Sequence, residues 1–389
     1  MNIAELKNKL IEIYGENEEE IRFFRSPGRV NLIGEHTDYN GGCVFPAALT
    51  MASTVAVRNR KDNIIRLFAT DLNYVVEAKL DCLSLYQSYR WGNYQLGVAD
   101  ELQKAGFMLT GCEMVFDDKV PLGGGLSSSA AIEVVTAVAL LSMNGYEPDM
   151  VEVAKLTQLA EHHYIGVHCG IMDQFASAMG KKDHAIFLDC KTLDYSLVPL
   201  DLAGHKLVIT NTNKKRSLGE SKYNERRKQC ESALADLKQD YKEAEYLCDI
   251  TYAQLLHSKN LIKNNIDLNR AMHVISENER VKLSVKALKE GDLSLLGQYM
   301  IESHESLRDL YEVSCLELDV LVEASLKQPG VLGSRMTGAG FGGCTVSIVR
   351  DSDIEGFIKN VGDIYKHKIG YEASFYLSET ADGGKEVFI

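Results

Sequence analysis

The chain has 389 residues, of which 45% are hydrophobic and 25% charged, a balance that folded soluble proteins usually have. This composition excludes an extensively disordered chain, and the length exceeds what one hydrophobic core usually organises, so we expect two domains. The formal net charge of −13 gives an acidic surface that repels phosphate backbones and argues against a nucleic-acid partner.

The chain begins with an amphipathic segment, in which apolar residues recur at helical spacing between charged ones: Ile3, Leu6, Leu10 and Ile13. This pattern predicts a first helix and differs from the uninterrupted apolar core of a signal peptide. The most apolar stretch, Val134–Leu141, is too short to span a bilayer, so we expect no membrane partner. Nine scattered cysteines without a CxxC pair suit free thiols in a reducing compartment, and we place the protein in the cytoplasm.

Short predicted strands and helices follow through the first half of the chain. The first two predicted strands, Ile21–Arg25 and Val30–Ile33, flank Ser26-Pro27-Gly28. The other predicted strands are Thr54–Val57, Ile64–Ala69, the hairpin His184–Leu188 with Tyr195–Val198, and Lys206–Thr210. The segments of helical period are Gln95–Leu102, Ala130–Met143 and Val151–His163. The second of these helices is almost entirely apolar and is therefore expected to be buried.

The character of the sequence changes in the second half. Long repeats of helical period dominate from Ser221 to about Ser325, and strand texture then returns. The chain is predicted to close with a β-α-β unit, formed by a strand at Thr345–Val349, a helix at Ile354–His367 and a strand at Ala373–Leu377. We therefore predict an α+β chain with two domains, residues 1–200 and residues 201–389, because the elements do not alternate regularly as βαβα.

The run PLGGGLSSS, at Pro121–Ser129, stands directly before the buried helix. Glycines lack a Cβ atom and adopt positive φ, so a bulky anion can approach their N–H groups closely. The N-terminus of the helix adds unpaired N–H donors and partial positive charge, and the serine hydroxyls add an oxygen ligand for Mg²⁺. The segment has no lysine, which excludes the Walker A loop. Taken alone, the run is also compatible with a turn that only caps a core helix.

A second glycine run, Gly338–Gly343, satisfies the GxGxxG pattern of dinucleotide-binding proteins. That fingerprint requires a following helix and an acidic residue about twenty positions further on. Here a strand-like segment follows, beginning at Cys344. The context therefore argues against a dehydrogenase, for which binding of NAD(P)H would be the discriminating observation.

A polar segment near the N-terminus, Arg29–Gly42, concentrates donors and acceptors between glycines, as recognition of a polyol requires. The alternative is a hydrated hairpin with a salt bridge between Arg29 and one acid. Further along, Asp173 stands among small and apolar residues and needs a partner, for which Arg29 is a candidate. A zinc site is disfavoured because adjacent histidines face different sides of a helix and no paired-ligand spacing occurs at His162, His163, His168 and Cys169.

These segments resemble the motifs of the small-molecule kinase superfamily that includes galactokinase, homoserine kinase, mevalonate kinase and phosphomevalonate kinase. The three motifs, in order, are RVNLIGEHTDYNGG at Arg29–Gly42, PLGGGLSSSAA at Pro121–Ala131 and MTGAGFGGCTV at Met336–Val346. GEHTDYNGG is the galactokinase form, and CGIMDQF at Cys169–Phe175 and NERRKQC at Asn224–Cys230 are similar to galactokinases as well. The resemblance runs from about residue 20 to the end. It implies an N-terminal ribosomal-S5-like domain and a C-terminal ferredoxin-like domain with added helices, with the active site between them.

The resemblance also implies a set of site residues. Asp173 would accept or orient the proton of a sugar's anomeric hydroxyl, and Arg29 would face that hydroxyl and the transferring phosphoryl group. The sugar's other hydroxyls would be bound by Glu35, His36, Asp38, Gly170 and Tyr223. The ATP phosphates would be bound by Gly123, Gly124, Gly125, Leu126, Ser127 and Ser128, adenine by Trp91, and Mg²⁺ by Ser129 and Glu161. Met336–Gly343 would brace the first motif, and Lys215 lies at a position near the phosphates to which we assign no catalytic role.

The implied function is transfer of the ATP γ-phosphoryl group to the anomeric oxygen of a hexose, with galactose preferred because of GEHTDYNGG. An N-acetylgalactosamine kinase shares much of this pattern and is the alternative within the enzyme class. A regulatory protein that binds sugar and ATP without turnover is a third hypothesis, against which the presence of Asp173 and Arg29 argues. We expect a monomer whose partners are the sugar, ATP and Mg²⁺.

Overall fold

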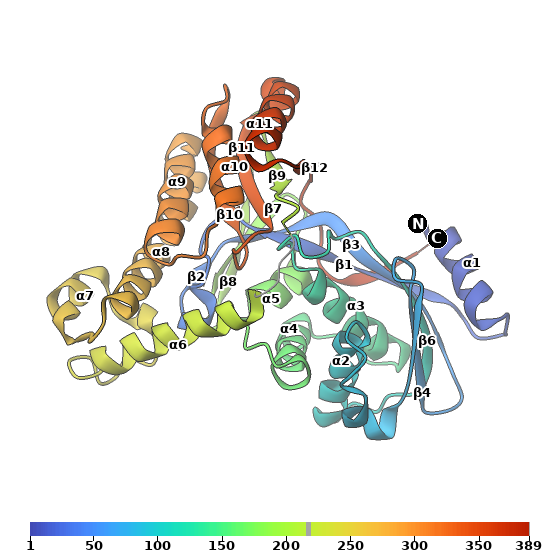
Figure 1. Ribbon diagram of the computed structural model, residues 1–389. Helices are drawn as coiled ribbons and strands as arrows, with labels where there is room; N and C mark the ends of the chain where they lie inside the picture. The colour runs from blue at the N-terminus through green and yellow to red at the C-terminus, as the bar shows by residue number, and fades with distance from the viewer. Residues whose placement is uncertain (215–218, 389) are drawn as a thin grey trace.

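The N-terminal half is built on a six-stranded sheet in the computed structural model, which describes residues 1–214 and 219–388. The strand order is β13-β1-β3-β6-β4-β5, and neighbouring strands are antiparallel except for β4 and β6. The strands are β1 Arg22–Asn31, β3 Pro46–Asn59, β4 Ile64–Ala69, β5 Tyr74–Lys79, β6 Cys112–Asp118 and β13 Lys385–Val387. Because β13 pairs with β1, the end of the chain returns to the N-terminal sheet (Figure 1).

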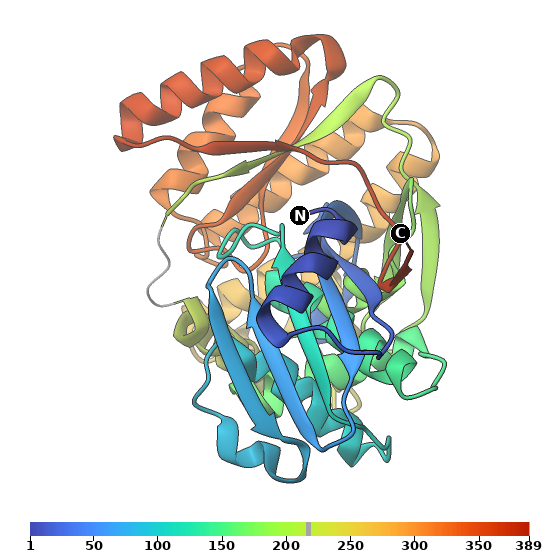
Figure 2. The ribbon, with the colours of Figure 1, turned by 90° about the vertical axis from the view of Figure 1, so that its right-hand side faces the viewer.

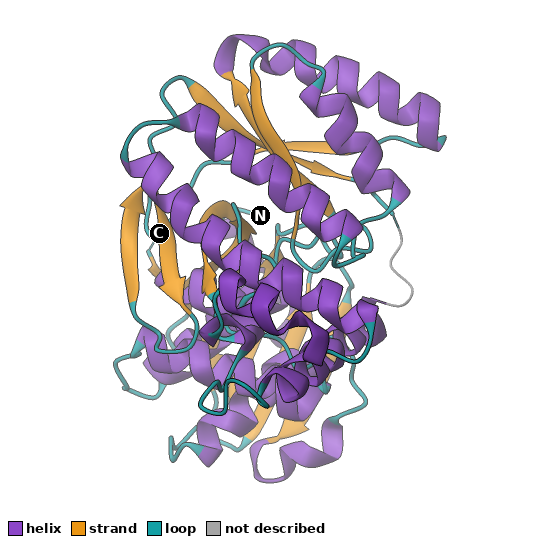
Figure 3. Cartoon of the chain, turned by 90° about the vertical axis from the view of Figure 1, so that its left-hand side faces the viewer, coloured by secondary structure: helices purple, strands orange, loops and turns teal. Residues whose placement is uncertain are grey.

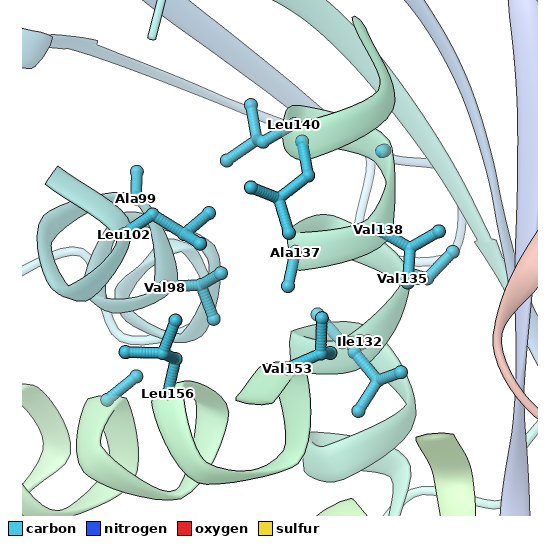
Figure 4. Packing of buried hydrophobic residues seen from close by; sticks show 14 of the residues in the cluster. Val98, Ala99, Leu102, Ile132, Val135, Ala137, Val138, Leu140, Val153 and Leu156 are labelled. Atoms are coloured by element: carbon cyan, nitrogen blue, oxygen red, sulfur yellow. The ribbon is translucent and has the colours of Figure 1, made fainter. Parts of the chain in front are cut away.

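Alternate residues of the same strands are buried on opposite faces of this sheet. Phe24 and Val55 belong to the core beneath four helices, α2 Gly92–Lys104, α3 Ser128–Met143, α4 Met150–Ala160 and α5 Met172–Met179. Their neighbours Phe23 and Ala56 pack on the other face against α1 Ile3–Tyr14, which lies in front of the strands in Figure 2. Figure 4 shows how side chains of α2, α3 and α4 meet in the larger core.

The second half contains a four-stranded antiparallel sheet of order β10-β11-β9-β12. Its strands are β9 His205–Asn211, β10 Val331–Thr337, β11 Cys344–Arg350 and β12 Ser374–Leu377. The helices of this half are α6 Gly219–Leu237, α7 Tyr252–Ser258, α8 Asn265–Lys289, α9 Leu293–Asp309, α10 Leu316–Leu326 and α11 Ile354–Ile369. Core residues of α8 and α9 cover one face of the sheet and those of α10 and α11 the other, a layering that Figure 3 shows.

A small third sheet is formed within the first half of the chain. It has the order β2-β7-β8, with β2 Cys43–Val44, β7 His184–Asp189 and β8 Tyr195–Pro199. The predicted boundary at residue 200 falls in the loop between β8 and β9 and stays a prediction. Within the described ranges, every helix is either too short or too polar to serve as a membrane span.

Most predicted elements are confirmed, including the hairpin β7–β8 and the closing β-α-β unit β11-α11-β12. The strand order of the second half is that of a ferredoxin-like sheet, so the α+β, two-domain class is confirmed as well. The helix predicted at Val151–His163 ends earlier, at Ala160, and continues as a π-helical turn over Glu161–Ile165.

The prediction of separate strands at Ile21–Arg25 and Val30–Ile33 is wrong, because β1 runs continuously from one into the other. The pairing of β1 with β3 shifts in register between Pro27 and Arg29. This irregularity accommodates a proline, which has no N–H to donate. Gly28 is required beside it, since a Cβ atom there would lie 2.6 Å from the Leu126 carbonyl oxygen.

Candidate active site

The three motifs meet although they lie far apart in the sequence. The backbone N–H of Arg29, in β1, donates to the carbonyl oxygen of Leu126 at 3.0 Å. The Gly338 N–H, in the turn between β10 and β11, donates to Glu35 Oε1 at 2.8 Å. A Cβ atom at Gly338 would lie 2.8 Å from the Gly125 carbonyl oxygen, so the third motif also contacts the second. The predicted bracing of the first motif by the third is confirmed.

Arg29 and Asp173 form a bidentate ion pair at the centre of this region. Arg29 Nε donates to Asp173 Oδ1 and Nη2 donates to Oδ2, each at 2.8 Å. The remaining Arg29 nitrogen, Nη1, donates to the Gly125 carbonyl oxygen at 2.7 Å, and Ser127 Oγ donates to Asp173 Oδ2. Arg29 is buried at 3% exposure, whereas the Asp173 side chain is 32% exposed in the first turn of α5. One carboxylate is thus oriented by three donors and still accessible, and the partner inferred for Asp173 from the sequence is the observed one.

The glycine–serine run forms a turn that leads directly into α3. Gly123 and Gly125 have φ of 68° and 74°, and the N-cap residue Ser127 is also left-handed at 61°. The Ser127 side chain does not cap the helix, because its hydroxyl is directed to Asp173. The first N–H groups of this 16-residue helix have no intrahelical acceptor and no cap from the Ser127 side chain, so the end of α3 beside the turn suits an anion. Ser128, predicted to bind phosphate, donates its hydroxyl to Asp118 Oδ2 at 2.6 Å and so anchors the run to β6.

Glu161, predicted as a metal ligand, is buried in the π-helical turn at 8% exposure. Burial raises the pKa of its carboxyl, and hydrogen bonds from Cys169, Ser129 and Gln174 act in the opposite direction. Ser129 therefore lies close enough to Glu161 to affect its carboxyl, and the joint binding of a metal ion by these two residues stays a prediction. A carboxylate with a neighbouring hydroxyl oxygen matches the ligand preference of Mg²⁺.

The predicted sugar-binding residues occupy two different environments. Glu35 is 1% exposed, and its carboxylate accepts from Asn31 Nδ2 at 2.9 Å, from the Gly338 N–H and from Arg335. Burial raises the pKa of Glu35, while the Arg335 charge opposes this shift. These contacts make Glu35 a link between the first and third motifs, in addition to any contact with a sugar.

Asp38 and Gly170, by contrast, lie against each other with room for little else. A Cβ atom at Gly170 would lie 1.9 Å from Asp38 Oδ2, so only glycine fits at this position. Burial and the nearby Asp173 charge raise the pKa of Asp38 to about 7. The side chain is therefore within the electrostatic reach of the Arg29–Asp173 pair.

His36 and Tyr223 meet in an aromatic cluster between the two halves of the chain. His36 has a left-handed φ of 64° and is hydrogen-bonded through Nδ1 to the Tyr39 hydroxyl at 2.8 Å. Burial lowers the pKa of His36 to about 3, so its ring is neutral. The Tyr223 ring, from α6, lies 5.5 Å from that of His36 and 5.2 Å from that of Tyr39. The second half thus contributes a side chain to the first motif, as predicted.

Two predicted residues are not connected to the cluster by the described contacts. Trp91 precedes α2 and lies edge-on to Phe116 of the core at 5.8 Å, so its contact with adenine stays a prediction. Lys215 lies outside the described residues. The second glycine run joins antiparallel strands β10 and β11 as a tight turn, and no helix follows it, which excludes a dinucleotide fold at this position.

The buried face of α8 supports the first motif, and the sequence analysis missed this role. Glu277 Oε1 accepts from the Gly34 N–H at 3.0 Å and from Ser303 Oγ at 2.5 Å. His273 Nε2 is hydrogen-bonded to the Glu35 carbonyl oxygen at 3.2 Å. Although burial acts to raise it, the pKa of Glu277 is lowered to about 2, chiefly by the Arg280 charge. The only signal in the sequence is polar residues at helical spacing, which usually indicates a solvated face.

Comparisons with known proteins agree with this geometry. The galactokinase galactose-binding signature matches residues 8–59, the GHMP kinase N-terminal domain residues 93–181, and the GHMP kinase C-terminal domain residues 284–367. The chain is 47% identical to the galactokinase of Clostridium tetani over 388 residues, which cover 100% of this chain and 98% of that protein. It is 48% identical to the galactokinase of Bacillus subtilis over 386 residues, with 98% of each chain covered.

Solved structures give the same assignment. The Lactococcus lactis galactokinase complexed with galactose superposes with a TM-score of 0.96 at 40% identity, and each chain is fully covered. The Methanococcus jannaschii mevalonate kinase, at 19% identity, shares the fold with a TM-score of 0.67 over 94% of this chain and 100% of that one. The chain therefore belongs to the galactokinase family of GHMP kinases, and it is an ATP-dependent sugar kinase.

Proposed function

We propose that this chain transfers the γ-phosphoryl group of ATP to the C1 hydroxyl of D-galactose, giving galactose 1-phosphate. The observation that carries the proposal is the Arg29–Asp173 pair, oriented by Ser127 at the edge of the glycine–serine turn. The match of residues 8–59 to the galactose-binding signature supports galactose as the sugar.

In the proposed reaction, the C1 oxygen attacks the γ-phosphorus, its bond to hydrogen breaks, and the bond between the γ-phosphorus and the β,γ-bridging oxygen of ATP breaks. Asp173, as a carboxylate, accepts or orients the proton of the hydroxyl. Phosphoryl transfer depends mainly on positioning and on neutralisation of charge. Arg29 contributes to both, since it holds Asp173 and places a cation beside the turn that would receive the phosphates.

The remaining predicted roles fit the described contacts and are part of the proposal. Gly123, Gly124, Gly125 and Leu126 would offer backbone N–H groups to the ATP phosphates, together with Ser127 and the N-terminus of α3. When bound, Mg²⁺ would neutralise phosphate charge, and the oxygens of Ser129 and Glu161 would hold it. The sugar site would be lined by Glu35, His36, Asp38, the Gly170 backbone and Tyr223. Trp91 would contact the adenine ring of ATP.

We also propose that the reaction takes place in the cytoplasm, between domains 1–200 and 201–389 of a monomer. All nine cysteines are free thiols, which suits a reducing compartment. The contact of Tyr223 with His36 supports a site shared by the two domains.

A coupled assay of ATP consumption tests the proposal with galactose, N-acetylgalactosamine, glucose and mevalonate as separate acceptors. We expect turnover with galactose at a kcat/KM at least tenfold above that of the other three, and a product that has lost its reducing end. A higher kcat/KM with N-acetylgalactosamine would instead support the alternative sugar kinase. Binding of galactose and ATP without turnover would support a regulatory protein and contradict the proposal.

A further inference from the structure

A chain of hydrogen bonds runs from the candidate sugar site into the second half of the protein. His36 Nδ1 lies 2.8 Å from the Tyr39 hydroxyl, and that hydroxyl lies 2.7 Å from the Tyr311 hydroxyl. The chain ends at Cys230 in α6, whose Sγ lies 3.1 Å from the Tyr311 hydroxyl. On the other side of the imidazole, His36 Nε2 lies 3.3 Å from the Ala339 carbonyl oxygen in the third motif. These bonds therefore connect segments that are far apart in the sequence.

The direction of each bond follows from the chemistry of its neighbours. Burial lowers the pKa of His36 to about 3, so the ring is neutral and has one N–H donor and one acceptor nitrogen. A carbonyl oxygen can only accept, so the proton is on Nε2, and Nδ1 accepts from the Tyr39 hydroxyl. The Tyr39 oxygen then accepts from the Tyr311 hydroxyl, and the Tyr311 oxygen accepts from the Cys230 thiol. Burial raises the pKa of Cys230 to about 12, so the thiol carries the proton that it donates.

The Tyr311 side chain is held in place from several sides. It is fully buried, and its ring centroid lies 4.7 Å from that of His36 and 4.6 Å from that of His273. The Tyr311 carbonyl oxygen accepts from Arg226 Nε at 2.8 Å, which fixes the backbone as well. A hydroxyl held this firmly can impose its donor direction on Tyr39, which is less buried.

We infer that Tyr39 and Tyr311 are positioning residues that fix His36 as the Nε2–H tautomer, so that His36 offers the sugar a hydrogen-bond donor. The inference rests on the proposed function, because it assumes that His36 lines the sugar site. The bond from Nε2–H to Ala339 is long at 3.3 Å, so this N–H can be shared with an oxygen of the sugar. The opposite tautomer would direct a lone pair toward the Ala339 carbonyl oxygen and would offer the sugar no N–H from this nitrogen.

Two measurements test the inference, namely the tautomer of His36 and the kinetics with galactose. NMR of enzyme with ¹⁵N-labelled histidines distinguishes the two tautomers, and the spectrum of His36→Gln assigns the His36 signals. We expect the Nε2–H tautomer in wild type and a mixture of tautomers in Tyr39→Phe and Tyr311→Phe. Loss of one hydrogen bond weakens binding by about three- to tenfold, so the KM for galactose should rise by about this factor in both variants. The kcat and the KM for ATP should stay within about twofold of wild type.

The matched control is Tyr241→Phe. The Tyr241 ring packs against the hydrophobic cluster that contains Tyr311, but its hydroxyl donates to the Gln254 carbonyl oxygen in α7, at 3.0 Å. This variant removes a tyrosine hydroxyl from the same cluster and should keep the wild-type tautomer of His36 and the wild-type KM for galactose.

The Nδ1–H tautomer of His36 in wild type would overturn the inference, as would an equal rise of the KM in Tyr241→Phe. A raised KM without a change of tautomer, or a changed tautomer without a raised KM, would overturn it too, because the tautomer would then not determine sugar binding. If one of the two phenylalanine variants does not fold, the other decides. Phosphorylation of galactose by wild type is measured in the same preparations: its absence would contradict the proposed function, whereas the spectrum of wild type would still decide whether the tautomer is fixed.

Discussion

Replacing Asp173 with asparagine separates the catalytic role of this residue from its structural one. The carboxylate accepts two N–H bonds from Arg29 and one O–H bond from Ser127. Asparagine keeps the shape and one acceptor oxygen, but it loses the charge and turns an NH₂ group toward donors. The variant can therefore neither accept the hydroxyl proton nor neutralise Arg29.

Two magnitudes follow. A positioned general base contributes about 10²–10⁴-fold, so we expect kcat to fall by at least about 10², or about 2.7 kcal/mol of barrier. Removing one partner of a fully buried ion pair costs about 3–5 kcal/mol of unfolding free energy. The Asp173 side chain is 32% exposed and asparagine retains one bond, so we expect about 1–2 kcal/mol here.

Turnover would be measured with saturating ATP and galactose, and stability by urea unfolding. Glu113→Gln is the matched control, because Glu113 pairs with Arg58 and Arg60, each at 2.7 Å, in β6 outside the site. The control should lose stability and keep kcat. A folded Asp173→Asn enzyme with kcat within about tenfold of wild type would refute the reasoning.

Three further predictions concern the sugar site and its support. Gly170→Ala should raise the KM for galactose at least about tenfold, because the new Cβ atom would overlap Asp38 Oδ2. The control is Gly356→Ala, which should leave the KM unchanged because no atom lies within 4 Å of the new Cβ position. Equal effects of the two substitutions on the KM would contradict the steric argument. Since the pKa of Asp38 is raised to about 7, kcat/KM for galactose should rise with pH through about 7. Because the pKa of Asp38 is 3.8 when unfolded and about 7 when folded, wild type loses stability progressively as pH rises from about 4 to about 7. Asp38→Asn should therefore gain thermal stability relative to wild type across that interval; a constant difference between about pH 4 and pH 7 would contradict the assignment. Glu277→Ala leaves the partly buried Arg280 without its partner and removes the acceptor of the Gly34 N–H and the Ser303 hydroxyl, so it should lower the unfolding free energy by about 3–5 kcal/mol in urea titration; a loss below about 1 kcal/mol would show that these contacts do not stabilise the fold.

Local chemistry explains why part of the site is readable from the residues alone. A carboxyl among small apolar residues needs a cation, and this reasoning led from Asp173 to Arg29 across 144 positions. The glycine run was recognised for a similar reason, because positive φ at Gly123 and Gly125 is a property of the residue type itself.

Other parts were missed because they depend on contacts between distant segments. Glu35 was predicted only as a sugar ligand, yet donors from Asn31, Arg335 and Gly338 converge on its carboxylate. The polar face of α8 reads as a solvated surface, yet Glu277 is fully buried against the first motif. The periodicity of a helix tells which residues share a face, but not whether that face meets water or another loop.

The sequence alone therefore determined the family, the α+β class, most of the elements and the residue types of a phosphate and polyol site, because each rests on local pattern or motif. The tertiary structure decided which donors orient Asp173, that Ser128 anchors its loop to Asp118, and that Gln174 donates to the buried Glu133. These relations join α3, α5 and β6, and their energies depend on burial and distance, which no single segment encodes.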